Sequence, residues 1–307
     1  MISFVLRRLM SAVPTIFIVV TISFFLMRFA PGGPFNLERP LPPQTMANIM
    51  ATYKLDQPLF SQYLSYLGNA LTGDLGPSFI YKDNTVSELI GKALPYSVEL
   101  GAYAILLALI GGVALGTIAA LRQNGIIDFI LMSFATIGVT VPNFVVGPVL
   151  TLIFAVLLSW LPAGSWGDGS FRFLLLPVIA LALPQLAVFA RLTRGAMIEA
   201  LHTDHIRTAR AYGLPPRVVV ITHALRGAML PVVSYLAPCA AALLTGSAVI
   251  ETIFTIPGVG RYFVLGALNR DYPLVMGTVI LVAVFVILFN LLVDIAYGLL
   301  DPRVRND

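Results

Sequence analysis

Long runs without a charged side chain divide this sequence into apolar and polar segments. The six longest contain no Asp, Glu, Lys or Arg and cover residues 9–27, 100–121, 129–167, 173–190, 227–250 and 272–293. The hydrocarbon core of a bilayer is about 30 Å thick, and a helix of roughly 20 apolar residues crosses it. In lipid, a helix satisfies all of its own backbone polar groups. The pattern therefore predicts an all-α, polytopic membrane protein with six transmembrane helices.

The third run, 129–167, is too long for one straight helix and too short for two helices with a turn. Proline bends a helix, and a broken helix is tolerated in a membrane where protein or a water-filled cavity covers it. We therefore treat five residues of this run as candidates for lining a pathway through the membrane: Gly138, Pro142, Asn143, Gly147 and Pro148. A kinked helix that only packs on its neighbours is an equally good interpretation.

A pair of glycines in the second run carries a packing signal. Gly112 and Gly116 are four residues apart and therefore lie on one face of a helix. Small residues at this spacing let two helix backbones approach closely in a membrane. We expect this pair to mark a helix contact rather than a functional site.

The overall composition agrees with a membrane location. Hydrophobic residues make up 58% of the chain and charged residues 11%, whereas soluble domains carry about 25% charged residues. The net charge of +4 needs no nucleic-acid partner. The single cysteine, Cys239, excludes an internal disulfide. Arg7 and Arg8 precede an apolar run of full span length without a small-residue cleavage site, so no cleavable signal peptide is expected.

Basic residues are distributed unequally between the two sides that six spans define. The loops 122–128 and 191–226 and the two chain ends together carry eleven of the 19 basic residues, and the other side carries eight. Basic residues favour the cytoplasmic side of a membrane. We therefore expect both termini to be cytoplasmic. The eleven are Arg7, Arg8, Arg122, Arg191, Arg194, Arg207, Arg210, Arg217, Arg226, Arg303 and Arg305.

The first outer segment is long enough to form a small cap. It begins with Pro31, Gly32, Gly33 and Pro34, which stop a helix. Gln44–Tyr53 and Pro58–Leu71 read as short amphipathic helices, the second with Tyr63, Tyr66 and Leu67 on one face. Those aromatic residues are equally typical of interfacial anchors. The expected domains are 1–29, the cap 30–96, and a core 97–307.

The inner loop 191–226 is the most polar part of the core and contains six Arg and all three His residues. Ile206, Ala209 and Tyr212 are spaced at three, which predicts a short helix ended by Gly213 and the prolines after it. A helix of this kind suits docking against another protein, and a loop that merely fixes topology is the alternative. The surroundings are rich in Arg and poor in carboxylates, which argues against a metal site at His202, His205 and His223.

Sequence signals of catalysis are missing. The sequence contains no Gly-x-x-x-x-Gly-Lys-Ser/Thr phosphate loop, so we expect no ATP and no other cofactor on this chain. The uncharged runs hold no histidine and no paired carboxylates, which excludes the usual intramembrane enzymes. An ion channel or ion-coupled carrier would place charges near the middle of its spans. We therefore expect a protein that is not an enzyme and that obtains energy from a partner.

Several motifs together resemble one protein family. The run Ile206–Arg226 with the following Leu230 and Pro231 resembles the cytoplasmic motif of permease subunits in ATP-binding-cassette importers. Ala209 and Gly213 match that motif. An Arg near position 207 in place of the usual Glu, and the late Leu-Pro, are typical of the peptide and nickel branch. Further matching segments are Arg7–Arg8, Ala30–Gly32, Leu55–Leu59, Gly73–Gly76, Glu251–Gly260, Asn269–Pro273 and Asp301–Arg303.

The resemblance, which is strongest to oligopeptide permeases, implies the type I importer permease fold and a bacterial inner-membrane location. It implies a second homologous permease subunit, two ATPase subunits that hold ATP and Mg²⁺, and a periplasmic peptide-binding protein that delivers an oligopeptide. Permeases for dipeptides, glutathione or nickel are the alternatives. In the family a cytoplasmic coupling helix inserts into a groove of the ATPase. Here it corresponds to Arg207, Thr208, Ala209, Arg210, Ala211, Tyr212, Gly213 and Leu214, with Ala209 permitting close approach and both arginines making polar contacts.

Overall fold

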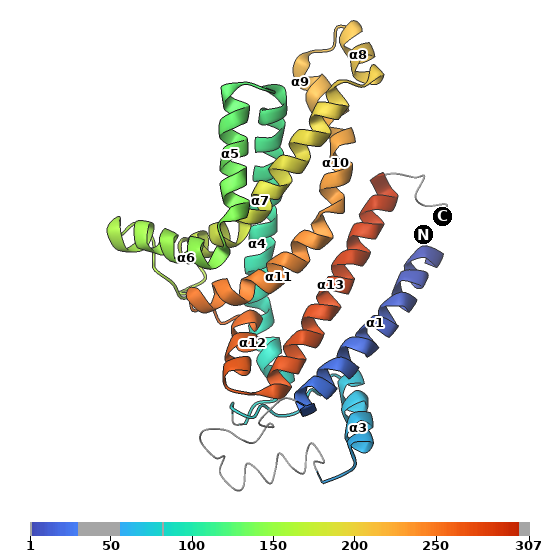
Figure 1. Cartoon of the computed structure of the whole chain (residues 1–307), viewed down its shortest axis with the longest axis vertical. Helices are drawn as coiled ribbons and strands as arrows, with labels where there is room; N and C mark the ends of the chain where they lie inside the picture. The colour runs from blue at the N-terminus through green and yellow to red at the C-terminus, as the bar shows by residue number, and fades with distance from the viewer. Residues whose placement is uncertain (1, 30–55, 82, 301–307) are drawn as a thin grey trace.

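The computed structural model describes residues 2–29, 56–81 and 83–300, and these form an assembly of helices (Figure 1). The prediction of an all-α protein is confirmed. The helix expected at Gln44–Tyr53 and the motif Asp301–Arg303 lie outside the described residues. The helices are α1 Ile2–Phe29, α3 Leu59–Leu71, α4 Val86–Leu121, α5 Ile126–Thr140, α6 Asn143–Leu150, η1 Thr151–Leu157, α7 Phe171–Leu201, α8 Asp204–Ala211, α9 Pro216–Val218, η2 Val219–Ala224, α10 Leu225–Ser234, α11 Leu236–Ile253, α12 Val259–Leu268 and α13 Tyr272–Leu300.

Most of the uncharged runs lie within helices that are long enough to span a membrane. By length and apolar composition, α4, α7, Pro216–Ser234 and Tyr272–Ile295 can each cross a membrane. Two bent pairs, 126–157 and 236–253, raise the number to six if each is one span. The first run corresponds to a shorter apolar segment of α1, Met10–Leu26, and the fifth run is shared between α10 and α11. The six spans expected from the sequence are therefore obtained only if α1 is counted as the first span and α10 and α11 together are counted as the fifth.

The third uncharged run is broken, as its prolines predict. α5 ends at Thr140, and the α6–η1 segment continues from Asn143 at an angle of 106° to it. Val141 has extended backbone angles, φ −81° and ψ 120°, because a residue before proline is disfavoured in the helical region. In Figure 1, α6 accordingly runs sideways from the lower end of α5. This bend explains why the run 129–167 is too long for one straight span and too short for two.

Small residues bring α4, α5 and α7 into close contact. A Cβ atom on Gly112 would lie 2.4 Å from Phe189 Cβ, and one on Gly116 would lie 2.4 Å from the carbonyl oxygen of Ala190. The predicted contact at this glycine pair is confirmed, and the partner is α7. Three buried alanines form the contact between α5 and α7: Ala135, Ala187 and Ala190.

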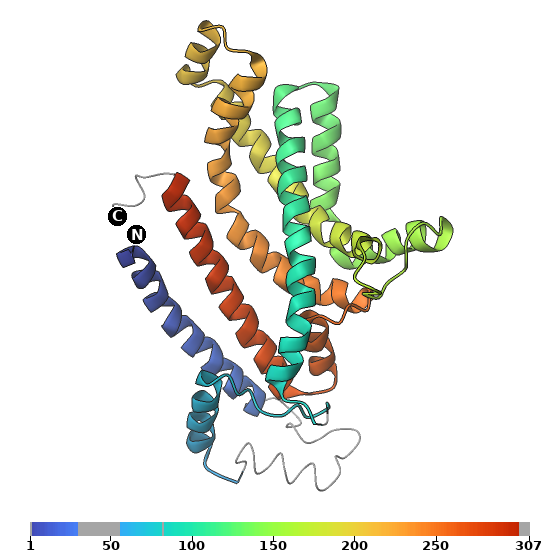
Figure 2. The ribbon, with the colours of Figure 1, turned by 180° about the vertical axis from the view of Figure 1, so that it is seen from behind.

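The bundle has two distinct ends. The turn between α4 and α5 and the α8–α9 segment lie at the upper end in Figure 1, and the start of α1 and the end of α13 point the same way. α3 and α12 lie at the opposite end. Seen from behind, α1 again runs beside α13 (Figure 2). Both ends of the described chain therefore lie toward the end that carries α8.

The opposite end includes the described part of the expected cap. α3 confirms the helix predicted at Pro58–Leu71, and its Tyr63 and Tyr66 are buried against Val20 and Phe24 of α1. The Tyr63 hydroxyl and Thr21 Oγ1 share a hydrogen bond of 2.7 Å. These rings therefore pack on protein. α4 begins at Val86 with a capping box formed by Thr85 and Glu88, so the expected domain boundary at 96/97 falls inside α4.

Candidate functional site

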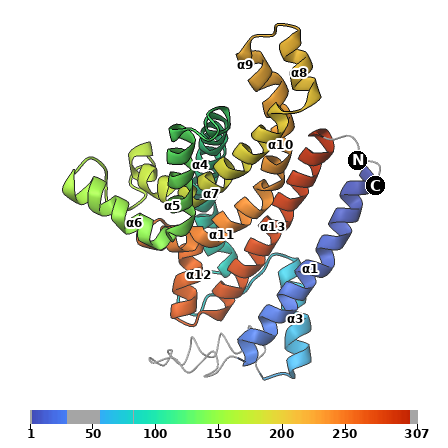
Figure 3. The ribbon, with the colours of Figure 1, turned by 45° about the horizontal axis from the view of Figure 1, so that its top comes forward.

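The exposed helix α8 occupies the middle of the inner loop and projects from the end of the bundle together with α9 (Figure 3). Asp204 lies in its first turn and Arg210 in its last, where their charges complement the helix dipole. The helix ends before Gly213, which has φ +74° and donates its N–H to Arg210 O at 3.0 Å. The predicted short helix and its glycine stop are confirmed. Gly213 serves here because glycine adopts positive φ without steric cost.

One face of α8 packs on the rest of the chain. Ile206 is fully buried and Ala209 nearly so. Their cluster contains residues of four other elements: Ala120 of α4, Met197 and Ala200 of α7, Val219 and Ala224 of η2, and Ala228 of α10. This contact fixes α8 to the ends of the long helices.

The packing corrects two expectations. Ala209 is buried in a cluster of its own chain, so its small size serves packing within this chain and not close approach to a partner. Tyr212 does not share the buried face with Ile206 and Ala209, because the helix ends at Ala211 and Tyr212 lies in the turn, 82% exposed. The spacing of Ile206, Ala209 and Tyr212 thus predicted the helix, but the helix ends one residue before Tyr212.

The opposite face of this region is open. Arg207, Thr208, Arg210 and Ala211 on α8 are exposed, and so are Tyr212, Gly213 and Leu214 in the following turn. Arg207 pairs with Asp204 at 3.1 Å, but both side chains are largely exposed, so the pair adds little stability. Tyr and Arg are the residue types most often found at the energetic centres of protein interfaces. Two guanidinium groups beside an exposed tyrosine therefore make this face a candidate docking surface.

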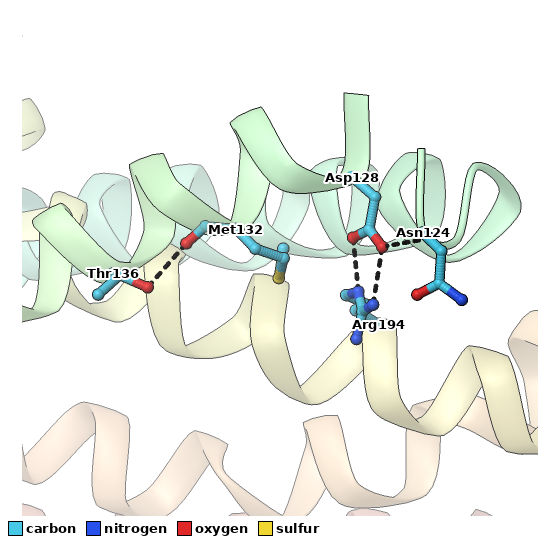
Figure 4. Close-up of polar contacts among 5 residues, drawn as sticks. All are labelled: Asn124, Asp128, Met132, Thr136 and Arg194. Carbon is cyan, nitrogen blue, oxygen red and sulfur yellow. Dashed lines mark hydrogen bonds and ion pairs between the residues drawn. The ribbon is translucent and has the colours of Figure 1, made fainter. Parts of the chain in front are cut away.

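An ion pair joins α5 and α7 toward the same end of the bundle. Arg194 Nε and Nη2 donate to Asp128 Oδ1 and Oδ2 at 2.6 and 2.7 Å, and the backbone N–H of Asn124 donates to Oδ2 at 2.9 Å (Figure 4). From the sequence, Arg194 indicated only a cytoplasmic loop, and Asp128 carried no signal of its own. A separation of 66 residues gave no local pattern that could link them.

The five candidate pathway residues do not share one surface. Gly138 faces α7, where its Cβ would lie 3.2 Å from Ala187 Cβ, and Gly147 faces Phe254, next to the end of α11, at 3.3 Å. Pro142 and Pro148 are exposed, and Asn143 is half-buried. Both glycines thus follow the packing interpretation. A role in the pathway stays a prediction for the two exposed prolines and Asn143.

Buried carboxylates organise the far end of the bundle. Glu251 of α11 is fully buried, accepts a 2.8 Å hydrogen bond from Ser97 Oγ of α4 and a 3.1 Å bond from the backbone N–H of Arg261. Asp271 is also buried and accepts from the hydroxyl of Ser78 and from three backbone N–H groups. Burial raises the pKa of Asp271 above the ordinary value of an aspartate, and its hydrogen bonds oppose that rise. Within 2–29, 56–81 and 83–300, no three His, Cys, Asp or Glu side chains gather to hold a metal ion.

Comparison with known families covers nearly the whole chain. Residues 112–306 match the family described as "Binding-protein-dependent transport system inner membrane component". Residues 1–101 match the family of N-terminal segments of such membrane components.

Individual relatives extend over the full length. The chain is 53% identical over 305 residues to the oligopeptide transport system permease protein OppB of Salmonella typhimurium, covering 99% of this chain and 100% of that one. OppB of Haemophilus influenzae is 52% identical with the same coverage. The dipeptide transport system permease protein DppB of Bacillus subtilis is 45% identical over 302 residues, 98% of this chain and 97% of that one.

These similarities confirm the resemblance to importer permeases that the motifs indicated. The chain is a membrane transport subunit of multi-pass inner-membrane type, with apolar helices long enough for that location. It belongs to the family of binding-protein-dependent transport system inner membrane components.

Proposed function

We propose that this chain is one permease subunit of an ATP-binding-cassette importer that takes up oligopeptides across the bacterial inner membrane. Full-length identity of 53% to a permease named for oligopeptide transport supports this substrate class. The 45% identity to a dipeptide permease makes dipeptides the second candidate. The observation that carries the coupling role is α8, a helix with one exposed face whose Ile206 and Ala209 are buried in a cluster with residues of α4, α7, η2 and α10.

The importer contains partners that supply what this chain lacks. Two ATPase subunits hold ATP and Mg²⁺, a second homologous permease forms the other half of the pathway, and a periplasmic binding protein delivers the peptide. The surface formed by Arg207–Leu214 docks on an ATPase subunit, which requires the inner loop and both termini to be cytoplasmic. Arg207, Arg210 and Tyr212 supply the contact. Gly213 gives the turn.

The packing of α8 suits it to pass motion into the membrane. Ile206 is fully buried in one cluster with Val219 and Ala224 of η2 and with Met197 and Ala200, which are one turn apart on α7. A protein interior is packed as densely as a crystal and transmits displacement rather than absorbing it. A movement of α8 by the ATPase therefore displaces the adjoining ends of α7 and α10, which share this cluster.

Two exposed side chains test the docking role without touching the buried face of α8. Tyr212→Ala and Arg210→Ala should insert normally, while co-purification of the ATPase subunits and uptake should each fall about tenfold or more, as for central interface residues. Asn69→Ala, an exposed change in α3, is the control and should leave both unchanged. Full ATPase association with both variants would show that this loop is only a topology anchor.

The substrate and subunit composition need a separate measurement. The chain, its second permease and the ATPase subunits are reconstituted in liposomes with the binding protein outside. We expect ATP-dependent uptake of oligopeptides, with dipeptides taken up less well, and no uptake by this chain alone. Uptake by the isolated chain with ATP would refute the proposal.

A further inference from the structure

The ion pair between Asp128 and Arg194 is a two-point contact between α5 and α7. Both nitrogen–oxygen distances, 2.6 and 2.7 Å, are short, and the two planar groups meet fork to fork (Figure 4). The Asp128 side chain is only 5% exposed and that of Arg194 is 27% exposed. A bidentate contact of this kind fixes the relative orientation of its partners as well as their separation.

The rest of the α5–α7 contact does little to fix the helices along their length. Its fully buried part consists of Ala135, Ala187 and Ala190, with Gly138 against Ala187 and with Met132 the one larger α5 side chain packed on the cluster. Small side chains allow close approach, but they provide few projections that interlock. Packed helices can slide past one another in small shear movements. The ion pair is therefore the feature that sets the register between α5 and α7.

The position of the pair relates this register to transport. Arg194 lies one turn before Met197, which belongs to the buried cluster that includes Ile206 of α8, and Gly116 of α4 is packed against the backbone of Arg194. Asp128 lies in the first turn of α5, and the other end of α5 meets the broken segment at Val141 and Pro142. The pair thus lies between the support of the docking helix and the bend in the membrane.

We propose that Asp128 and Arg194 are positioning residues that couple ATP hydrolysis to uptake by making α5 follow α7. This inference rests on the proposed function, because the movement enters through α8. When α7 is displaced, the two-point contact carries α5 and the α6–η1 segment with it. Without that contact α7 slides on the alanine surface, and ATP is hydrolysed without a matching movement of the pathway.

The test measures ATP hydrolysed per substrate imported by the complete reconstituted importer. Asp128→Asn and Arg194→Gln should raise this ratio about tenfold, a typical size for a coupling between sites. The exchanged pair, Asp128→Arg with Arg194→Asp, should lower the ratio again. Thr136→Val is the matched control, because Thr136 is exposed on the same helix and its hydroxyl donates only to Met132 O (Figure 4). A merely structural role would reduce the amount of complex and leave the ratio at the wild-type value.

If the single variants do not assemble, Arg194→Lys decides the question, because it keeps the charge and loses the two-point contact. A raised ratio supports the proposal. A wild-type ratio in every assembled variant, or an exchanged pair as uncoupled as the single variants, overturns it. A wild-type importer that takes up no peptide would instead refute the proposed function, and the coupling role with it.

Discussion

The hydroxyl of Ser97 joins the carboxylate of Glu251 to the first turn of α12. It donates to Glu251 Oε1 at 2.8 Å and accepts from the backbone N–H of Val259, also at 2.8 Å. Glu251 Oε2 accepts from the N–H of Arg261 at 3.1 Å. One serine and one glutamate therefore hold α4, α11 and α12 together and satisfy N–H groups that have no partner within α12.

Loss of the Glu251 carboxylate should destabilise this end of the bundle. In Glu251→Ala the Ser97 hydroxyl and the Arg261 N–H lose their acceptor, and an unsatisfied buried donor costs about 1–3 kcal/mol. The measurement is the thermal midpoint of the purified complex in detergent.

Gly258 provides the matched change. Its Cβ would lie 2.3 Å from Glu251 Oε2 and 2.6 Å from Ser97 Oγ, so Gly258→Ala should also destabilise the wild type. The cost of Gly258→Ala should be smaller when Glu251 is already alanine, because one of the two clashes is gone. Strictly additive costs would contradict this account of the contact.

The buried aspartate between α12 and α13 predicts a dependence of stability on pH. Burial raises the pKa of Asp271, so the folded chain holds this proton more tightly than the unfolded chain, whose aspartates titrate near about 3.9. The contribution of Asp271 to stability is then greatest at acid pH and falls as the pH rises through the folded value. The stability of wild type relative to Asp271→Asn should therefore be larger at mildly acidic than at neutral pH. A difference that grows toward neutral pH would mean that the four hydrogen bonds outweigh burial.

Features set by neighbouring residues could be predicted from the sequence. The break at Pro142, the close contact at Gly112 and Gly116, and the short helix before Gly213 all depend on residue types within one or two turns. Backbone sterics and helix periodicity act over that range, so the pattern is sufficient. The same local rules predicted α3.

Features set by packing could not be predicted in this way. The spacing of Ile206 and Ala209 shows that they share a face, but not that their own chain covers that face. The contact between Ser97 and Glu251 joins residues 154 positions apart. A single sequence gives no distance between such residues, so both buried contacts of Glu251 and the partner of Asp128 became evident only in the folded chain.

The positions of α3 and α8 predict that the two helices lie on opposite sides of the membrane. The two helices lie at opposite ends of the bundle (Figure 1), and basic residues gather in the loop that contains α8. Reporter fusions at Asn69 and at Thr203 should therefore report the periplasmic and the cytoplasmic side respectively. Both positions on one side would contradict six spans with cytoplasmic termini.

Two glycines, Gly213 after α8 and Gly195 in α7, distinguish the effect of backbone strain from the effect of crowding. A Cβ on Gly213 or on Gly195 of α7 would meet no atom within 4 Å, so neither position is limited by space. They differ in conformation, because Gly213 has φ +74° and Gly195 lies within the regular helix α7. Alanine at Gly213 is therefore strained by about 1 kcal/mol or more, whereas alanine in a helix is favoured over glycine by a similar amount.

Gly213→Ala should consequently alter the turn that presents Tyr212 and Leu214, and ATPase subunits should dissociate more readily from the purified complex. Gly195→Ala should leave their binding unchanged and raise the thermal midpoint slightly. The chain carrying either change should insert and assemble with its second permease, because neither residue contacts the membrane-embedded core through a side chain. The two substitutions add the same methyl group, so they differ only in backbone strain. Equal ATPase affinity in both variants would show that the left-handed turn at Gly213 does not contribute to docking. Arg207 and Arg210 would then be the principal contacts.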